Sequence, residues 1–177
     1  IEVFKDKEIY IFNRTYKKLS NFISKFKNKK IKQLKNFNSI FELPEIDLII
    51  NATSVGFNLW QKNKKGYYNL SCYSPIANTG KIYPVKIKNY NFFLKKNKNK
   101  RRKNLLLTAK FFKKHKKCQV FDIIYNPKMT ILIKAANKHT IKNLNGLNMN
   151  LDQAVFAFSI ANKLSDKNLI KKIMAKA

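Results

Sequence analysis

Short apolar runs that end in polar turns recur along the chain, and they predict buried strands. Residues 9–12 are apolar on both faces, residues 47–51 read DLIIN, and residues 119–124 read QVFDII. Strands that are apolar on both faces are typical of parallel sheets covered by helices on both sides. The pattern therefore predicts an α/β layer structure rather than an all-helical one.

Helical periodicity appears between these strands. Apolar residues recur at helical spacing within residues 16–27, and Thr15 is a candidate N-cap before them. A loop is expected from there to Pro44, and residues 143–150 are expected to form another loop around Gly146. Asp152 is expected to cap a helix that runs to Ile160. Three further helices are predicted at residues 104–117, 130–138 and 166–176.

The charge balance changes the picture of possible partners. The 177 residues include 38 Lys and Arg but only 9 Asp and Glu, which gives a formal charge of +29. Such a surplus is typical of proteins that bind nucleic acid or anionic membranes. The lysines, however, are spread along the whole chain, and arginine occurs only at Arg14, Arg101 and Arg102. We therefore favour biased residue usage over a dedicated nucleic-acid partner.

The cysteines, the histidines and the lengths of the apolar runs argue against a metal site and a membrane span. Cys72 and Cys118 lie far apart, and His115 and His139 stand in lysine-rich contexts that we interpret as surface. No metal site is predicted from this spacing. A chain of this size does not require a disulfide, which suits a reducing cytoplasm. No apolar run is long enough to span a bilayer. The expected location is cytoplasmic.

Four segments carry candidate chemistry where predicted strands end: EIYIFNRT (8–15), DLIINATSVGFN (47–58), VFDIIYNPKMT (120–130) and NGLNMNLDQAVFAF (145–158). Ligands of open α/β sheets sit beyond the carboxyl ends of the strands. A guanidinium after the second strand of a dinucleotide-binding sheet suits the 2′-phosphate of NADP, which it engages with two parallel hydrogen bonds. Arg14 fits that position. Taken alone, Asn-Arg-Thr also fits an ordinary polar turn at a strand end.

Together, in this order, the four segments resemble the cofactor domain of shikimate dehydrogenases, over somewhat more than half of the chain. The resemblance implies a Rossmann-like domain that binds NADP. It implies that the adenosine 2′-phosphate is held by Asn13, Arg14, Thr15 and Lys18, and that the cofactor path is lined by Thr53 and Ser54. It also implies that the nicotinamide is bordered by Ile123, Gly146 and Met149, and that the shikimate is reached by Tyr125 and Gln153.

The sequence also departs from that family. The glycine-rich diphosphate loop should precede the second strand, but the four glycines are Gly56, Gly66, Gly80 and Gly146. The backbone donors that cradle a diphosphate at a helix N-terminus are therefore not found here. The family's amino-terminal domain, with its catalytic Lys–Asp pair, is not found either. We expect a carboxy-terminal piece with an incomplete sheet, no catalytic residue of its own, and little activity alone.

The expected organisation has four parts. Residues 1–57 and 119–165 would form the NADP-binding domain, with a shikimate-contacting helix in the second stretch, and residues 166–177 a last helix. Residues 58–118 are longer than the corresponding family segment and are expected to be a basic insertion. We favour a surface insertion, which costs little free energy, over contact of the basic run at 95–104 with an anionic partner.

The resemblance implies NADP-dependent reduction of 3-dehydroshikimate to shikimate, in the biosynthesis of chorismate and aromatic amino acids. The expected partner is this small-molecule substrate, with no membrane partner, and a homodimer is left open for the intact enzyme. Two alternatives stay open. One is a piece of a quinate/shikimate dehydrogenase, and the other is a non-enzymatic basic module that binds nucleic acid.

Overall fold

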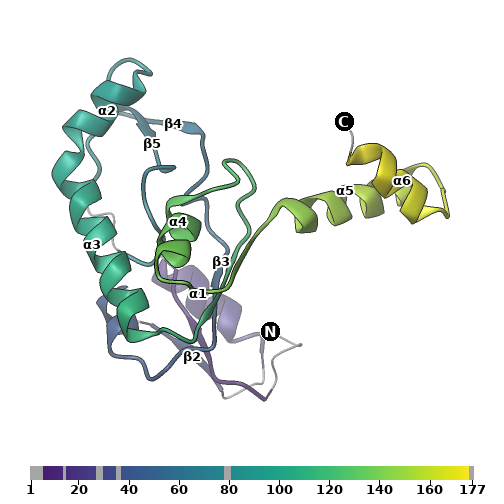
Figure 1. Ribbon diagram of the computed structural model, residues 1–177, viewed down its shortest axis with the longest axis horizontal. Coiled ribbons are helices and arrows are strands. Elements are labelled where there is room, and N and C mark those ends of the chain that lie inside the picture. The colour runs from purple at the N-terminus through teal and green to yellow at the C-terminus, as the bar shows by residue number, and fades with distance from the viewer. Residues whose placement is uncertain (1–5, 14, 27–29, 35–36, 78–80, 176–177) are drawn as a thin grey trace. The chain divides into compact units, whose positions relative to one another are not determined.

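The computed structural model describes residues 6–13, 15–26, 30–34, 37–77 and 81–175, without the side chains of Tyr16 and Phe37. The chain divides into two compact units, residues 1–44 and residues 45–177. Each unit contains parallel strands joined by helices (Figure 1). The predicted α/β class with a parallel sheet is confirmed. The four-part division expected from the sequence stays a prediction.

The first unit is a small strand–helix–strand element. β1 (Ile9–Ile11) pairs in parallel with β2 (Ile31–Gln33), and α1 (Tyr16–Ile23) connects them. A short 3-10 helix, η2 (Phe37–Phe41), follows. Leu19 of α1 and Ile31 of β2 are buried. Thr15 is the N-cap of α1, as predicted. β2 lies where a loop was expected. The strand was not predicted because only one residue of its IKQ sequence is apolar.

The second unit is built on a three-stranded parallel sheet. The strand order is β3 (Leu48–Asn51), β6 (Gln119–Asp122) and β7 (Asn143–Asn145). α4 (Ile131–Lys138) joins β6 to β7 and contacts both strands. The face that carries Val120 and Asp122 is buried. The other face carries a row of three paired apolar residues, Ile50, Phe121 and Leu144, of which Ile50 is 48% and Leu144 60% exposed.

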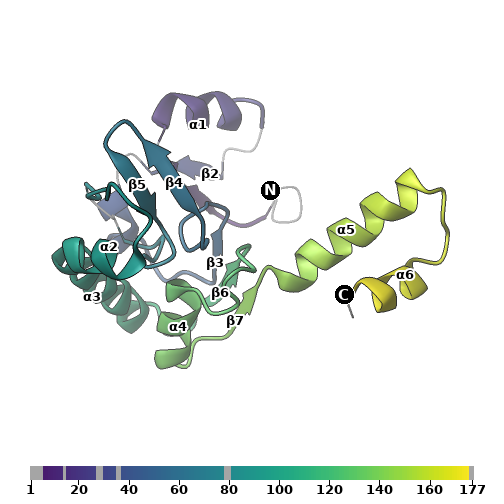
Figure 2. The same cartoon turned by 90° about the horizontal axis from the view of Figure 1, so that it is seen from above.

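A long central segment, residues 58–118, connects β3 to β6. It contains the antiparallel hairpin β4 (Trp60–Asn63) and β5 (Gly66–Asn69), then α2 (Tyr90–Lys96) and α3 (Lys98–Lys114) (Figure 2). Its core holds Cys72, Tyr73, Val85 and Phe93.

Buried asparagines fasten the loops of the central segment to α3. Asn104 donates to the carbonyls of Ser74 and Ala77 at 3.0 and 2.9 Å and accepts from Ser74 N–H at 2.8 Å. The side-chain amide of Asn97 holds Tyr83 in the same way, because it accepts from the Tyr83 N–H and donates to the Tyr83 carbonyl. Because these buried amides have hydrogen-bond partners, the segment is a folded subdomain rather than a loose loop.

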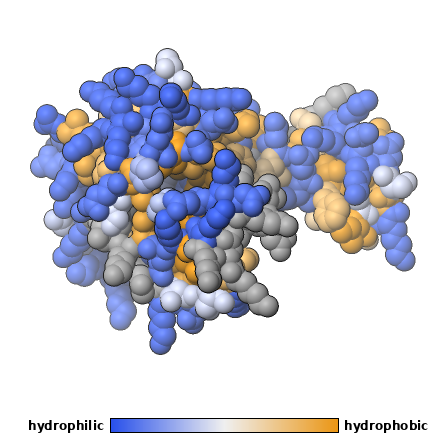
Figure 3. Space-filling model, turned by 90° about the horizontal axis from the view of Figure 1, so that it is seen from below, coloured by the Kyte–Doolittle hydropathy of each residue, from blue (hydrophilic) through white to orange (hydrophobic). Residues whose placement is uncertain are grey.

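The last two helices form a hairpin. α5 (Leu147–Ala161) buries Val155 and Ser159, α6 (Lys167–Met174) buries Ile170, and these two helices contact each other. Lys171 pairs with Asp152 at 2.5 Å across them. Much apolar surface stays exposed, as Figure 3 shows for this hairpin, the lobe on the right. The exposed large apolar residues are Leu147, Phe156, Phe158, Ile160, Leu164, Leu169 and Ile173.

Several helix boundaries differ from the sequence predictions. α5 begins at Leu147, directly after β7, so the expected loop at 143–150 is wrong and Asp152 lies inside the helix instead of capping it. α3 begins at Lys98, six residues earlier than predicted. Two other helices begin within one residue of their predicted starts, α4 at Ile131 and α6 at Lys167. Thr130 caps α4 by accepting from Ile133 N–H at 3.2 Å, and Asp166 caps α6 by accepting from Leu169 N–H at 2.9 Å.

His115 is not a surface residue, although its lysine-rich sequence context suggested one. Its side chain is fully buried at the end of α3, with its ring 4.4 Å from that of Phe111. Burial lowers the pKa of this histidine. Within the described part of the chain, no three Cys, His, Asp or Glu side chains gather as a metal site would require. No described helix has the length and apolarity needed to cross a membrane.

Candidate functional site

The turn after β3 is held by the side chain of Asn51. Its amide oxygen accepts from the N–H of Thr53 at 3.1 Å and from the Thr53 hydroxyl at 2.7 Å. Its amide nitrogen donates to the Val55 carbonyl at 3.0 Å. The Thr53 hydroxyl also accepts from Val55 N–H. Thr53 therefore shapes this turn, while the side chain of Ser54 is exposed.

Asp122 joins the ends of three elements. This fully buried carboxylate ends β6 and accepts from Asn51 Nδ2 at 2.8 Å, at the end of β3. It also accepts from the hydroxyl of Thr130, the cap of α4, at 2.6 Å. Burial raises the pKa of Asp122, and the hydrogen bonds from Thr130, Ile124 and Asn51 oppose that rise. The network fixes where β3, β6 and α4 meet, which is at the carboxyl edge of the sheet.

Ile123 and Gly146 are brought into contact at the same edge. The N–H of Gly146 donates to the Ile124 carbonyl at 3.2 Å. A Cβ on Gly146 would lie only 1.9 Å from the carbonyl oxygen of Ile123. No side chain fits in that space, so glycine is required for β7 and α5 to approach the end of β6 this closely.

Tyr125 follows β6 on an exposed turn. Its ring lies 6.1 Å from that of Phe57, centroid to centroid, and the Asn126–Pro127 peptide bond, one residue further along, is cis. The N–H of Asn58 donates to the carbonyl of Asn126 at 3.1 Å. The turns after β3 and β6 are therefore tied to each other directly.

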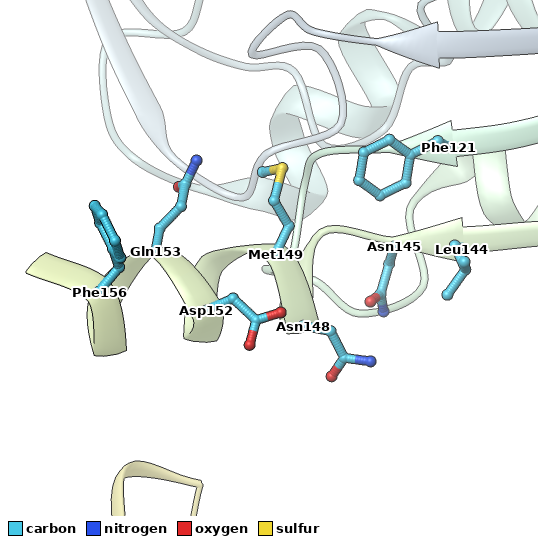
Figure 4. Close-up of a pocket in the computed structure, with 8 residues that line it drawn as sticks. All are labelled: Phe121, Leu144, Asn145, Asn148, Met149, Asp152, Gln153 and Phe156. Atoms are coloured by element: carbon cyan, nitrogen blue, oxygen red, sulfur yellow. The ribbon is translucent and has the colours of Figure 1, made fainter. Parts of the chain in front are cut away.

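Met149 and Gln153 line a groove of about 610 Å³ between the exposed sheet face and α5. Figure 4 shows their side chains on one side of α5, with Asn148 and Asp152 on the other. Phe121 and Leu144 supply the sheet side of the groove, and Phe156 closes it along the helix. Most of the groove surface is apolar, and its polar lining residues are Asn145, Asn148, Asp152 and Gln153.

The first unit holds the residues expected at the 2′-phosphate. The Asn13 side chain accepts from Thr15 N–H at 2.9 Å, which forms a tight turn at the start of α1. The Thr15 hydroxyl makes no capping hydrogen bond with the helix, and Lys18 is exposed in the first turn of α1. Arg14 lies outside the described residues.

Sequence reasoning missed the residues that build the edge. Asn51, Asp122 and Thr130 were not singled out, although their mutual hydrogen bonds position the turns that carry Thr53 and Tyr125. The available signal was a polar residue at the end of each apolar run. A buried polar residue there needs a partner, and the neighbouring strand end supplies it.

Comparison with known proteins gives two curated relatives. The chain is 30% identical over 163 residues to the shikimate dehydrogenase (NADP(+)) of Methanocaldococcus jannaschii, covering 90% of this chain and 43% of that protein. It is 29% identical over 171 residues to the shikimate dehydrogenase (NADP(+)) of Caldanaerobacter subterraneus subsp. tengcongensis, covering 92% and 44%. The chain thus spans less than half the length of these relatives. No protein-family model matches the sequence.

One solved structure supports the fold. The chorismate mutase/shikimate 5-dehydrogenase fusion protein from Clostridium acetobutylicum matches with a TM-score of 0.53 and 23% identity, covering 94% of this chain and 43% of that one. At this identity the likeness concerns the fold alone, and it agrees with the predicted α/β architecture. Since the two curated relatives match over nine-tenths of the chain, the resemblance indicated by its four motifs is confirmed: the chain is similar to part of the shikimate dehydrogenases.

Proposed function

We propose that this chain is the carboxy-terminal, NADP-binding portion of a shikimate dehydrogenase, which reduces 3-dehydroshikimate to shikimate. The observation that carries the proposal is the shared edge of the sheet, where Ile123 meets Gly146 and Asp122 ties β3 to β6. Ligands of open α/β sheets bind at such an edge. The names of the two relatives give the class of cofactor and substrate.

The start of α1 supports an anionic ligand such as the 2′-phosphate. Its first turn contains Lys17 and Lys18 and no acidic residue. The positive end of a helix dipole favours acids, so two lysines there work against the helix unless an anion lies nearby. In the sequence, Arg14 lies between β1 and the start of α1. We propose that Asn13, Arg14, Thr15 and Lys18 together hold the phosphate.

The second unit would hold the reacting end of the cofactor. Bound NADPH would supply the hydride. Ile123, Gly146 and Met149 would form an apolar wall that keeps water from the nicotinamide, with Thr53 and Ser54 beside the path of the cofactor. The Tyr125 hydroxyl and the Gln153 amide would hydrogen-bond the substrate and orient its carbonyl. We assign no proton donor to this chain.

The exposed apolar surface fits a larger enzyme. α5 contains no Lys or Arg, and apolar side chains cover most of its circumference apart from the side of Asn148 and Asp152. A helix with so wide an apolar surface is normally covered by other protein. Together with Ile50, Phe121 and Leu144, it presents a surface that further protein would cover. We therefore propose that the reaction requires protein beyond this chain and that the chain alone turns over little substrate.

The cofactor assignment is tested by measuring NADPH and NADH binding from the change in their fluorescence. Arg14→Asp should weaken NADPH at least tenfold while leaving NADH nearly unchanged, because only NADPH carries the 2′-phosphate. Lys25→Asp makes the same change of charge on an exposed residue after α1 and serves as the matched control.

Comparing the two variants distinguishes a local effect at the 2′-phosphate from a general effect of charge on nucleotide binding. Equal weakening of NADPH and NADH by Arg14→Asp would remove Arg14 from the 2′-phosphate. Equal weakening of NADPH by both variants would show that only overall charge matters. Failure of the unsubstituted chain to bind either nucleotide would contradict the proposed cofactor role.

A further inference from the structure

The central segment, residues 58–118, carries charged side chains of only one sign. It contains 18 Lys and Arg and no Asp or Glu, so all nine acidic residues of the protein lie outside it. Among the described residues, the ion pairs Lys32–Glu8 and Lys171–Asp152 lie outside it. Within it, Lys62 and Lys88 both approach the ring of Tyr67, at 5.6 and 5.3 Å from its centroid. This subdomain therefore has a uniformly positive charge.

The subdomain is fastened to the edge of the sheet that carries the candidate site. Val55, in the turn after β3, packs on its core cluster of Cys72, Tyr73, Val85 and Phe93. The N–H of Gly56 donates to the Leu70 carbonyl at 3.1 Å, and Asn58 N–H donates to the carbonyl of Asn126, next to Tyr125. Asn69 of β5 in turn donates to the Asn58 side chain at 3.2 Å.

The same contacts place the most basic helix end at this edge. Phe93 lies one turn before the start of α3 and shares the core cluster with Val55 of the site turn. Figure 1 shows α3 running on from α2, away from β4 and β5, and the chain after α3 leads into β6. The first six residues of α3 are Lys-Asn-Lys-Arg-Arg-Lys, and Lys98, Arg102 and Lys103 are exposed.

The ligands of the proposed function are anions. NADPH carries several phosphate charges, and dehydroshikimate carries a carboxylate. A surface of one sign beside a site raises the local concentration of ligands of opposite sign and their association rate by roughly 10- to 1,000-fold, in a manner that salt suppresses. We propose that the central segment is an electrostatic collector that speeds the capture of these anions at the carboxyl edge. This inference rests on the proposed function.

The test is the association rate of NADPH with the full chain, measured by stopped-flow fluorescence at low and high salt. A rim variant reverses four exposed charges at the site edge: Lys95→Glu, Lys98→Glu, Arg102→Glu and Lys103→Glu. A control variant reverses four exposed charges near the opposite edge of the sheet or the end of α4: Lys116→Glu, Lys117→Glu, Lys138→Glu and Lys142→Glu. Each variant changes the net charge by the same −8, from +29 to +21.

The expected result is a roughly tenfold slower association for the rim variant at low salt, with the dissociation rate unchanged and the difference lost at high salt. The control variant should slow association much less. Far-ultraviolet circular dichroism checks that both variants fold. As a second measurement, salt should slow NADPH association with the unsubstituted chain more steeply than with the rim variant.

Three outcomes would overturn the inference. Equal slowing by both variants would show that only overall charge matters. An unchanged NADPH rate, combined with loss of single-stranded DNA binding in the rim variant alone, would assign the surface to a nucleic acid. If the unsubstituted chain binds no NADPH, the proposed function fails and the inference fails with it, whereas a failure of the inference alone leaves NADPH binding intact.

Discussion

At the scale of single residues, Gly146 has the least room for a side chain among the described glycines. An added Cβ would meet the Ile123 carbonyl oxygen at 1.9 Å, and that obstacle is backbone, which cannot rotate away. Gly146→Ala should therefore destabilise the second unit by about 3 kcal/mol or more, as expected for strong overpacking. Ser54→Ala, at an exposed position in the same site, should stay within about 0.5 kcal/mol. Urea unfolding of both variants measures this, and similar midpoints would contradict the close packing.

Asp122 should give the stability of the chain a defined pH dependence. Burial raises its pKa above the ordinary value of 3.8, so the folded state holds the proton at a pH where the unfolded chain has lost it. Lowering the pH through the raised pKa toward 3.8 therefore increases the contribution of this group to stability, and the gain is complete below 3.8.

Asp122→Asn tests that sign because the amide keeps one acceptor for Asn51 and Ile124 but does not titrate. The free energy of unfolding of the unsubstituted chain, minus that of the variant, should rise as the pH falls from neutral to mildly acidic. Urea unfolding at the two pH values measures it. If this difference in the free energy of unfolding decreased as the pH was lowered, the carboxylate would be stabilised in its charged form.

At the scale of elements, the hairpin of α5 and α6 should drive self-association of the isolated chain. Phe158 is 45% and Ile160 64% exposed, whereas Val155 is buried. Replacing both Phe158 and Ile160 with Gln should reduce light scattering at high protein concentration while changing stability by less than about 1 kcal/mol. Val155→Ala should instead destabilise the hairpin without reducing scattering. Unchanged scattering in the double variant would exclude this surface as the cause.

Elements with strong local signals could be predicted from the sequence, and elements that depend on pairing could not. DLIIN and QVFDII became β3 and β6, as their apolar-rich runs predicted, although one face of this sheet stays exposed at Ile50. β2 and β7 are three residues long and mostly polar, so only pairing with β1 and β6 defines them. The hairpin of β4 and β5 turns before Gly66, which has a positive φ of 126°. In the sequence, this glycine was a usable but isolated signal for the turn.

For the candidate site, the motif resemblance pointed to turns that the fold brings to one edge of the sheet, but it did not reveal what holds them. Thr53, Tyr125 and Gly146 all follow strand ends at one edge of the sheet, as the segment order implied. The hydrogen bonds between Asn51, Asp122 and Thr130 join residues up to 71 positions apart in sequence. Such long-range partners leave no periodicity, so only the folded chain reveals them.

At the scale of the whole molecule, the charge of +29 raises the question of a nucleic-acid partner. We expect only non-specific binding, because lysines are widespread and arginine, the better base reader, occurs three times. A gel shift with mixed-sequence DNA should therefore vanish at moderate salt. Binding that survives moderate salt and prefers one sequence would support the basic-module alternative instead of the dehydrogenase portion.

The central claim is that this chain supplies the NADP-binding portion of a shikimate dehydrogenase. Its most direct test is a chimera in which the chain replaces the matched 163 residues of the Methanocaldococcus jannaschii relative. The assay follows NADPH formation from shikimate and NADP. We predict turnover by the chimera, little turnover by the chain alone, and at least a tenfold loss on Gln153→Ala in the chimera. A chimera that folds, binds NADPH and still shows no turnover would contradict the account.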